Sequence, residues 1–156
     1  MLRCPECRGE FDVPACACGY VAPCADGVYQ FTDEPAISLD APGRRYLGYE
    51  GVGAAYDGGV AQEEHDFGAF GACGRKLVGI LGKGCRVLDM GCGLGTAAIP
   101  LALAGARVVA ADISQVMCAE AARRARNFGA DKGITFARMN GYDLALVDGC
   151  VDAAVC

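Results

Sequence analysis

Two mainly apolar segments, separated by a glycine-rich turn, constrain the fold of this chain more than any other feature. The first, Val87–Met90, leads directly into three alternate glycines within Gly91–Gly95. The second, Val108–Ala111, ends at an acid, Asp112. This pattern predicts two strands of a parallel sheet beside a nucleotide pocket, in which the glycines let the backbone approach the ligand and the acid can hold ribose hydroxyls.

The spacing of the glycines narrows the choice of ligand. Dinucleotide sites use G-x-G-x-x-G, whereas this turn is Gly91-x-Gly93-x-Gly95 and has Thr96 where the third glycine would fall. Asp89 lies two residues before the first glycine, where a carboxylate disfavours a pyrophosphate but can orient a cation. The sequence therefore predicts a pocket for a nucleoside that carries positive charge.

Five ordered motifs resemble the class I S-adenosylmethionine-dependent methyltransferases. Their first motif, D-x-G-C-G-x-G, is matched from Asp89, and residues 112–117 resemble the family's D-x-S-x-x-M, with Ser114 capping the next helix. Residues 134–138 read as a third strand, residues 140–143 (N-G-Y-D) stand where the family has G-D-A-E, and residues 151–156 resemble its fourth strand, F-D-A-V-V-C. The resemblance covers roughly residues 85 to 156 and is more specific than a glycine motif alone.

The resemblance implies a cofactor site but no catalytic residue. The glycine motif would lie under the methionine part of S-adenosylmethionine, the acid that ends the second strand would bind the ribose, and the asparagine loop would contact adenine. The implied cofactor-binding residues are Asp89, Gly91, Cys92, Gly93, Gly95, Asp112, Ile113, Asn140 and Gly141. Each motif also has a simpler interpretation, because a glycine-rich turn is often only a turn and Asp112 can serve only as a helix cap.

The same resemblance predicts an α/β fold, a partial doubly wound Rossmann-like methyltransferase sheet with strand order 3-2-1-4. A full domain of this family has seven strands, so we expect a chain that stops at Cys156 to lack strands five to seven. Its fourth strand would then form an exposed edge, which a second copy or a partner chain can cover. We divide the chain into residues 1–33, a linker at 34–60, and the cofactor-binding half of the methyltransferase domain at 61–156.

The cysteines near the amino terminus predict a structural metal site. Cys4 and Cys7 form a C-x2-C pair, and Cys16 and Cys18 follow as a second pair, which supplies four soft ligands for a tetrahedral zinc ion. Residues 1–33 resemble a small zinc ribbon, whose tail at residues 20–31 would form a short hairpin. Because C-x2-C is commoner than C-x-C, Cys24 is an alternative to Cys16 or Cys18. The other interpretation is that these are reduced cysteines that act as small hydrophobes.

Two helices are expected outside the motifs. Residues 62–81 have an intermittent apolar face, and the pattern ends at Gly82. Residues 114–128 form a second amphipathic pattern, in which we expect the arginines at 123, 124 and 126 to form a solvated face. Tyr46, Tyr49 and Tyr56 in the linker resemble an aromatic segment that closes over the cofactor, although they can equally pack at a domain joint. The sole histidine, His65, lies among acidic residues and is expected to be solvated.

Composition excludes some classes of protein. The chain is 53% hydrophobic and 21% charged, with no apolar segment of membrane-spanning length and no signal peptide, so we expect a cytoplasmic location. A net charge of −5 argues against a nucleic-acid partner, although an RNA substrate and a small-molecule substrate both stay open. The predicted function is S-adenosylmethionine-dependent methyl transfer, with this chain carrying the cofactor-binding half. The alternative is a non-catalytic cofactor-binding or zinc-ribbon interaction module.

Overall fold

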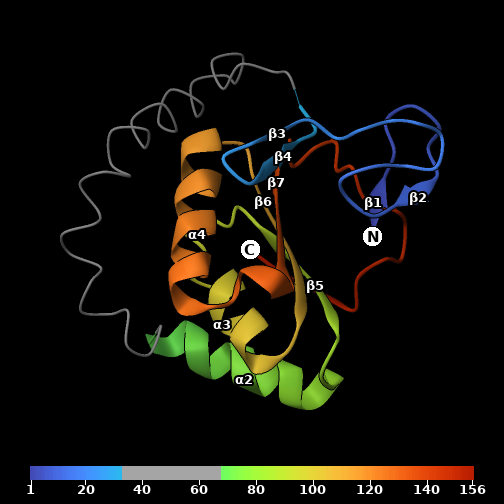
Figure 1. Ribbon diagram of the computed structural model, residues 1–156. Helices are drawn as coiled ribbons and strands as arrows, with labels where there is room; N and C mark the ends of the chain where they lie inside the picture. The colour runs from blue at the N-terminus through green and yellow to red at the C-terminus, as the bar shows by residue number, and fades with distance from the viewer. Residues whose placement is uncertain (33–67) are drawn as a thin grey trace.

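The computed structural model describes residues 1–32 and 68–156, which form a mixed sheet with helices on one face and a cysteine-containing segment on the other (Figure 1). We call residues 1–22 the cysteine module. It contains β1 (Leu2–Arg3) and β2 (Glu10–Phe11), which pair antiparallel as a small separate sheet.

The main sheet has six strands in the order β3-β4-β7-β6-β5-β8. Its central strands are parallel: β5 (Arg86–Met90), β6 (Arg107–Asp112), β7 (Ile134–Arg138) and β8 (Ala153–Val155). Numbered among themselves, these four strands have the order 3-2-1-4, which confirms the predicted topology.

The tail of the predicted ribbon forms the expected hairpin, β3 (Cys24–Ala25) and β4 (Val28–Gln30). The hairpin also joins the main sheet, because β4 pairs in parallel with β7, with Tyr29 opposite Ala137. The Gln30 side chain extends this attachment by donating a hydrogen bond of 2.8 Å to Gln115 Oε1. Nothing in the sequence indicated that the predicted ribbon tail would extend the main sheet.

Three helices lie against one face of the sheet: α2 (Gly68–Leu81), α3 (Ala98–Ala104) and α4 (Gln115–Phe128). The short 3-10 turn η2 (Asp131–Gly133) leads into β7. α4 begins as predicted, since Ser114 Oγ accepts a hydrogen bond of 3.3 Å from the Met117 N–H. The predicted helix at residues 62–81 is confirmed from residue 68 onward. Its first residues, His65 and the three linker tyrosines lie outside the described residues.

Both faces of the sheet are buried, and alternate residues of β6 show how. Val108 and Ala110 pack among the residues of the three helices, whereas Val109 and Ala111 point to the opposite face. That opposite face is covered by the cysteine module through side chains such as Leu2 and Phe11, which are 3% and 5% exposed. The module therefore supplies the second layer that a parallel sheet requires.

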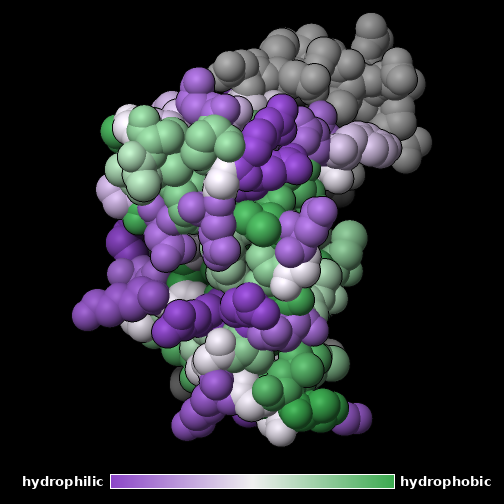
Figure 2. All heavy atoms as spheres, turned by 90° about the vertical axis from the view of Figure 1, so that its right-hand side faces the viewer, coloured by the Kyte–Doolittle hydropathy of each residue, from purple (hydrophilic) through white to green (hydrophobic). Residues whose placement is uncertain are grey.

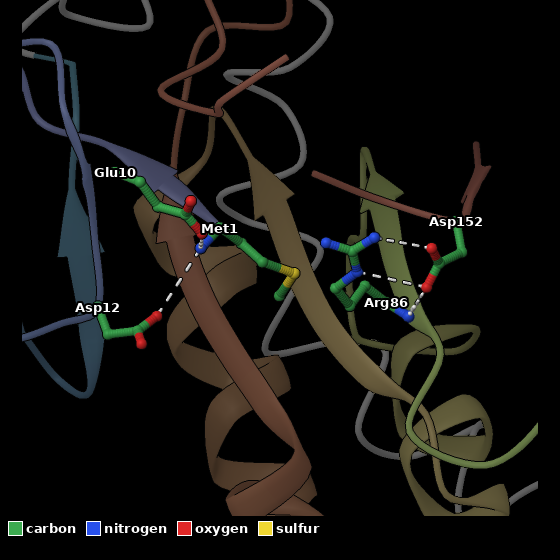
Figure 3. A network of polar contacts seen from close by, with 5 residues as sticks. All are labelled: Met1, Glu10, Asp12, Arg86 and Asp152. Carbon is green, nitrogen blue, oxygen red and sulfur yellow. Dashed lines mark hydrogen bonds and ion pairs between the residues drawn. The ribbon is translucent and has the colours of Figure 1, made fainter. Parts of the chain in front are cut away.

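Ion pairs and a backbone hydrogen bond hold the amino-terminal residues in place. The Met1 ammonium lies 3.1 Å from Glu10 Oε1 and 3.7 Å from Asp12 Oδ1 (Figure 3). The Arg3 N–H donates to the Ala145 carbonyl at 2.9 Å, so the segment after β7 is attached to β1. On this side of the molecule the described residues show hydrophilic and apolar side chains interspersed, and no single apolar patch covers the face (Figure 2).

β8 forms one edge of the sheet and pairs only with β5 among the described strands. Asp152 anchors it, because its carboxylate accepts hydrogen bonds from the Arg86 N–H and from the Arg86 guanidinium, both at 2.8 Å (Figure 3). The guanidinium holds the pKa of Asp152 down at about 2, and the same pairing raises the pKa of Arg86. Whether a second copy or a partner covers the free side of β8 stays a prediction. None of the described helices has the length and apolar character needed to cross a bilayer.

We expect Phe11→Ala to destabilise the whole described fold, not only the module. The ring is 5% exposed and contacts Tyr20 and Phe31 edge-on, so its removal should lower the free energy of unfolding by about 3 to 5 kcal/mol. Chemical denaturation followed by circular dichroism and by tyrosine fluorescence should show one shared transition. Val21→Ala is the control, because Val21 is 63% exposed and should change stability by less than about 0.5 kcal/mol. Two separate transitions would show that the module folds independently.

Candidate functional site

The residues that the sequence singled out gather at the carboxyl edge of the parallel strands. The glycine loop, residues 91–97, follows β5, Asp112 is the last residue of β6, and Asn140 follows β7. The Met139 N–H donates to the Asp112 carbonyl at 3.0 Å, so the segments after β6 and β7 are in contact. The carboxyl edge is where open α/β sheets bind their ligands.

The glycines of the loop have different roles. Gly91, Gly93 and Gly95 all have positive φ, at +74°, +50° and +78°, which favours glycine at each position. A Cβ atom at Gly91 or Gly93 would point into open space, so the backbone there is accessible to a ligand. A Cβ at Gly95 would lie 3.1 Å from Ile99 Cδ1 and 3.3 Å from Ala121 Cβ. Gly95 therefore lets the loop pack closely against α3 and α4, and it does not face the ligand.

A cavity of about 800 Å³ opens beside the loop. Asp89, Gly91, Cys92 and Gly93 line it, and α2 supplies the opposite wall. The wall residues from α2 are Cys73, Gly74, Lys76, Leu77 and Ile80. The lining is mainly apolar, and Asp89 and Lys76 are its only carboxylate and amine among the described residues. A volume of this size lies within the range of small-molecule sites.

Asp89 is the most unusual polar group in the cavity. Its side chain is 4% exposed, and Oδ2 has no hydrogen-bond partner among the described residues. The pKa of the Asp89 carboxyl is raised to about 6, mainly by burial and to a smaller extent by the nearby charge of Asp112, while a hydrogen bond from the backbone N–H of Ala98 partly opposes this rise. An unpartnered buried carboxylate is costly, and a cationic ligand group beside it would relieve that cost.

Asp112 connects the glycine loop to the start of α4. Its Oδ2 accepts a hydrogen bond of 3.0 Å from the Gly93 N–H, and its Oδ1 accepts one of 2.9 Å from the Ser114 N–H. A carboxylate has about four acceptor sites, so these two bonds leave acceptor capacity for hydroxyl groups. The simpler interpretation, a local cap, is therefore present in the structure and is compatible with a ligand role.

Ile113, Asn140 and Gly141 lie on the same edge but, like Asp112 and Gly95, outside the cavity lining. The Ile113 carbonyl accepts a hydrogen bond of 2.9 Å from Arg138 Nε. Asn140 Oδ1 accepts one of 3.0 Å from the Tyr142 N–H, and Gly141 lies against the Met90 side chain. Cys92 lines the cavity, where contact with the Cys118 thiol and burial raise its pKa well above the ordinary value, so it is a neutral thiol.

Arg124 corrects one expectation from the sequence. It does not belong to a solvated face, because it is only 4% exposed and its Nη1 donates to the Leu94 carbonyl at 3.1 Å. Arg123 and Arg126 are exposed, as expected.

The sequence also did not predict that α2 forms a wall of the cavity. The apolar spacing of residues 77–81 indicated a buried helix face but not which part of it a ligand could reach.

The four predicted metal ligands come together in the cysteine module. The sulfurs of Cys4, Cys7, Cys16 and Cys18 all lie within 4.8 Å of one another, and Cys4 Sγ and Cys18 Sγ are 3.6 Å apart. Tetrahedral zinc with bonds of about 2.3 Å places its sulfurs about 3.8 Å apart, so the arrangement fits such an ion. Burial raises the pKa of Cys4, but hydrogen bonds from the backbone of Cys7 and Glu6 lower it to about 7 overall. Cys24 lies in β3 and is not in the cluster.

Comparison with known proteins agrees with this geometry. Residues 87–156 match the model of a family described as a methyltransferase domain. A magnesium-protoporphyrin O-methyltransferase from Synechocystis is 42% identical over 74 residues, which are 47% of this chain and 31% of that protein. Residues 87–156 therefore match a methyltransferase domain of the class I S-adenosylmethionine-dependent type.

A solved structure shows the same fold. It comes from a Methanococcus maripaludis protein that is provisionally assigned as an S-adenosylmethionine-dependent methyltransferase. It superposes on this chain with a TM-score of 0.57 at 16% identity. The match covers 67% of this chain and 48% of that one. The magnesium protoporphyrin IX methyltransferase of Synechocystis, solved with bound S-adenosylhomocysteine, gives 36% identity and a TM-score of 0.46 over 58% of this chain and 41% of that one. The chain thus spans less than half the length of these relatives.

The titration of Asp89 should control the affinity of the cavity for a cationic ligand. The ionised carboxylate attracts the cation, so below a pH of about 6 binding must first remove a proton, and affinity should fall toward tenfold per pH unit. We expect calorimetry with S-adenosylmethionine from about pH 5 to about pH 8 to show this decline.

Asp89→Asn removes the titrating group and keeps the side-chain shape, so it is the control. The difference between the two pH profiles cancels the titration of the ligand itself. Parallel profiles for the two proteins would exclude contact between Asp89 and the ligand cation.

Proposed function

We propose that this chain binds S-adenosylmethionine in the cavity beside the glycine loop, and that its domain transfers the methyl group to a small-molecule acceptor. The observation that carries the proposal is Asp89, a buried residue that lines a cavity bordered by open glycine backbone and whose Oδ2 has no hydrogen-bond partner among the described residues. A site of this kind suits a ligand with a cation close to its point of contact with the backbone.

Most of the predicted residues then have a part in holding the cofactor. Asp89 and the loop residues 91–93 would hold the methionine part, Asp112 would accept hydrogen bonds from the ribose hydroxyls, and Asn140 with Gly141 would border adenine. When bound, S-adenosylmethionine supplies a methyl group that its sulfonium already activates. The chain's own residues therefore orient the reactants, and orientation alone contributes much of such a rate enhancement.

The cavity favours a particular kind of acceptor. Its lining is mainly apolar and contains one amine, Lys76, and no histidine among the described residues. An acceptor that arrives with an ionised nucleophile, such as a carboxylate, requires no general base and would pair with Lys76. Magnesium protoporphyrin is the first acceptor to test, because a relative that is 42% identical over 74 residues is named for it.

We also propose that the cysteine cluster holds a structural zinc ion and that the chain is cytoplasmic. Four sulfurs at tetrahedral spacing leave no open coordination position, so such an ion would stabilise the module without taking part in the reaction. All eleven cysteines are free, which suits a reducing compartment.

Asp112→Ala tests the cofactor site directly. We expect S-adenosylmethionine binding to weaken by about 1 to 3 kcal/mol in calorimetry, because the variant loses the ribose acceptor and the restraint on Gly93. Asp131→Ala is the control, because Asp131 is an exposed acid at the opposite end of β7. Unchanged affinity would remove Asp112 from the site.

An activity assay follows the binding assay. Mass spectrometry should detect a methylated acceptor and S-adenosylhomocysteine after incubation with magnesium protoporphyrin. Tight binding without methylation of any small-molecule acceptor would support the non-catalytic alternative, and methylation of RNA would overturn the small-molecule proposal.

The metal assignment has its own test. Protein purified without added metal should contain about one zinc ion per chain by elemental measurement, and Cys7→Ser should lower this content and the melting temperature. Cys7 is exposed, so the substitution changes ligation more than packing. Cys24→Ser, also at an exposed cysteine, should keep the full zinc content. A folded module without metal would contradict the proposal.

A further inference from the structure

Arg124 is a buried cation directly beneath the glycine loop. It lies in α4, is 4% exposed, and donates from Nη1 to the Leu94 carbonyl at 3.1 Å. Removing a guanidinium from water is costly unless its donors are satisfied, and apolar side chains of similar size fill such positions at lower cost. The position of this charge therefore requires an explanation beyond packing.

The loop is the part of the structure that most needs such an anchor. Its three glycines have positive φ, and glycine loses more conformational freedom on ordering than any other residue. Gly93 and Leu94 both line the cavity, so a shift of this segment changes the surface that a ligand meets.

Two opposite charges hold consecutive residues of the loop. The Asp112 carboxylate accepts from the Gly93 N–H at 3.0 Å, and the Arg124 guanidinium donates to the carbonyl of the next residue, Leu94. Hydrogen bonds to charged groups are stronger than those between neutral groups. One turn before Arg124 on the same helix, Ala121 packs closely against Gly95. α4 thus fixes the loop by a hydrogen bond and by close contact.

We propose that Arg124 is a positioning residue, which holds the glycine loop in the conformation that receives S-adenosylmethionine. The proposal rests on the cofactor site described above. Arg124 does not line the cavity, and it acts on the ligand through the Leu94 backbone.

A matched pair of substitutions separates this role from simple packing. Arg124→Met keeps an unbranched apolar stem and removes the donor, whereas Arg124→Lys keeps a cationic donor. We expect Arg124→Met to weaken S-adenosylmethionine binding by roughly tenfold or more in calorimetry, the size expected for a hydrogen bond to a charged group, and Arg124→Lys to recover most of the loss. The melting temperatures of Arg124→Met and Arg124→Lys are measured in parallel, and the loss of affinity in Arg124→Met should exceed the loss that any change in its stability accounts for.

Arg123→Met is the control on the same helix. Arg123 is exposed and pairs with Glu120 at 2.8 Å, so this variant should bind as the unmodified chain does. A loss of affinity in Arg124→Met that merely follows a loss of stability, without recovery in Arg124→Lys, would overturn the positioning role.

Hydrogen exchange gives a readout that needs no ligand. The Gly95 N–H donates to the Cys92 carbonyl at 2.8 Å within the loop, and Arg124→Met should speed its exchange while amides of β6 keep their protection. If the unmodified chain fails to bind S-adenosylmethionine but the loop exchanges faster in the variant, the proposed function fails and the anchoring role stands. Unchanged exchange and unchanged affinity together would refute the role of Arg124.

Discussion

A parallel sheet must bury both of its faces, and most of this structure follows from how that requirement is met. The helices that connect the strands cover one face, with Val108 and Ala110 beneath them. No helix of the described chain covers the other face, and the cysteine module lies there against Val109, Ala111 and Met139. The module is therefore a layer of the same fold, and Cys4 and Cys16 are buried in the core that it forms with this face of the sheet.

Two charged groups of the candidate site have hydrogen-bond partners in the glycine loop and a third has an oxygen without one among the described residues, an arrangement that suits the binding of a charged ligand. Asp112 and Arg124 have defined partners in the glycine loop, so they fix its backbone in the absence of ligand. Asp89 is buried with an oxygen that has no partner among the described residues, and this burial raises its pKa. A loop held at two consecutive residues beside an unsatisfied carboxylate would leave little of a ligand's binding energy to be used in ordering the protein.

The sequence predicted those features that depend on local pattern and failed for those that depend on distant contacts. The strand order, the Ser114 cap and the four clustered cysteines follow from motifs whose residues lie close together in the chain. The pairing of β4 with β7 has no local signal, because strands of two or three residues match almost any partner. Arg124 was wrongly predicted to be exposed for a related reason. Three arginines within four positions of a helix point to different sides, and only the position of the glycine loop decides which of them is buried.

The parallel pairing of β4 with β7 also sets the order in which the fold can be completed. Tyr29 is synthesised early, but its partner Ala137 follows about a hundred residues later. The side of β4 that pairs with β7 therefore stays unpaired until β7 has been synthesised. The sheet residues against which Phe11 and Leu2 pack emerge during the same interval. A metal held by Cys4, Cys7, Cys16 and Cys18 would keep this first segment compact while it waits. On a growing chain, the cysteine cluster would thus protect apolar surface from association before there is any cofactor site to support.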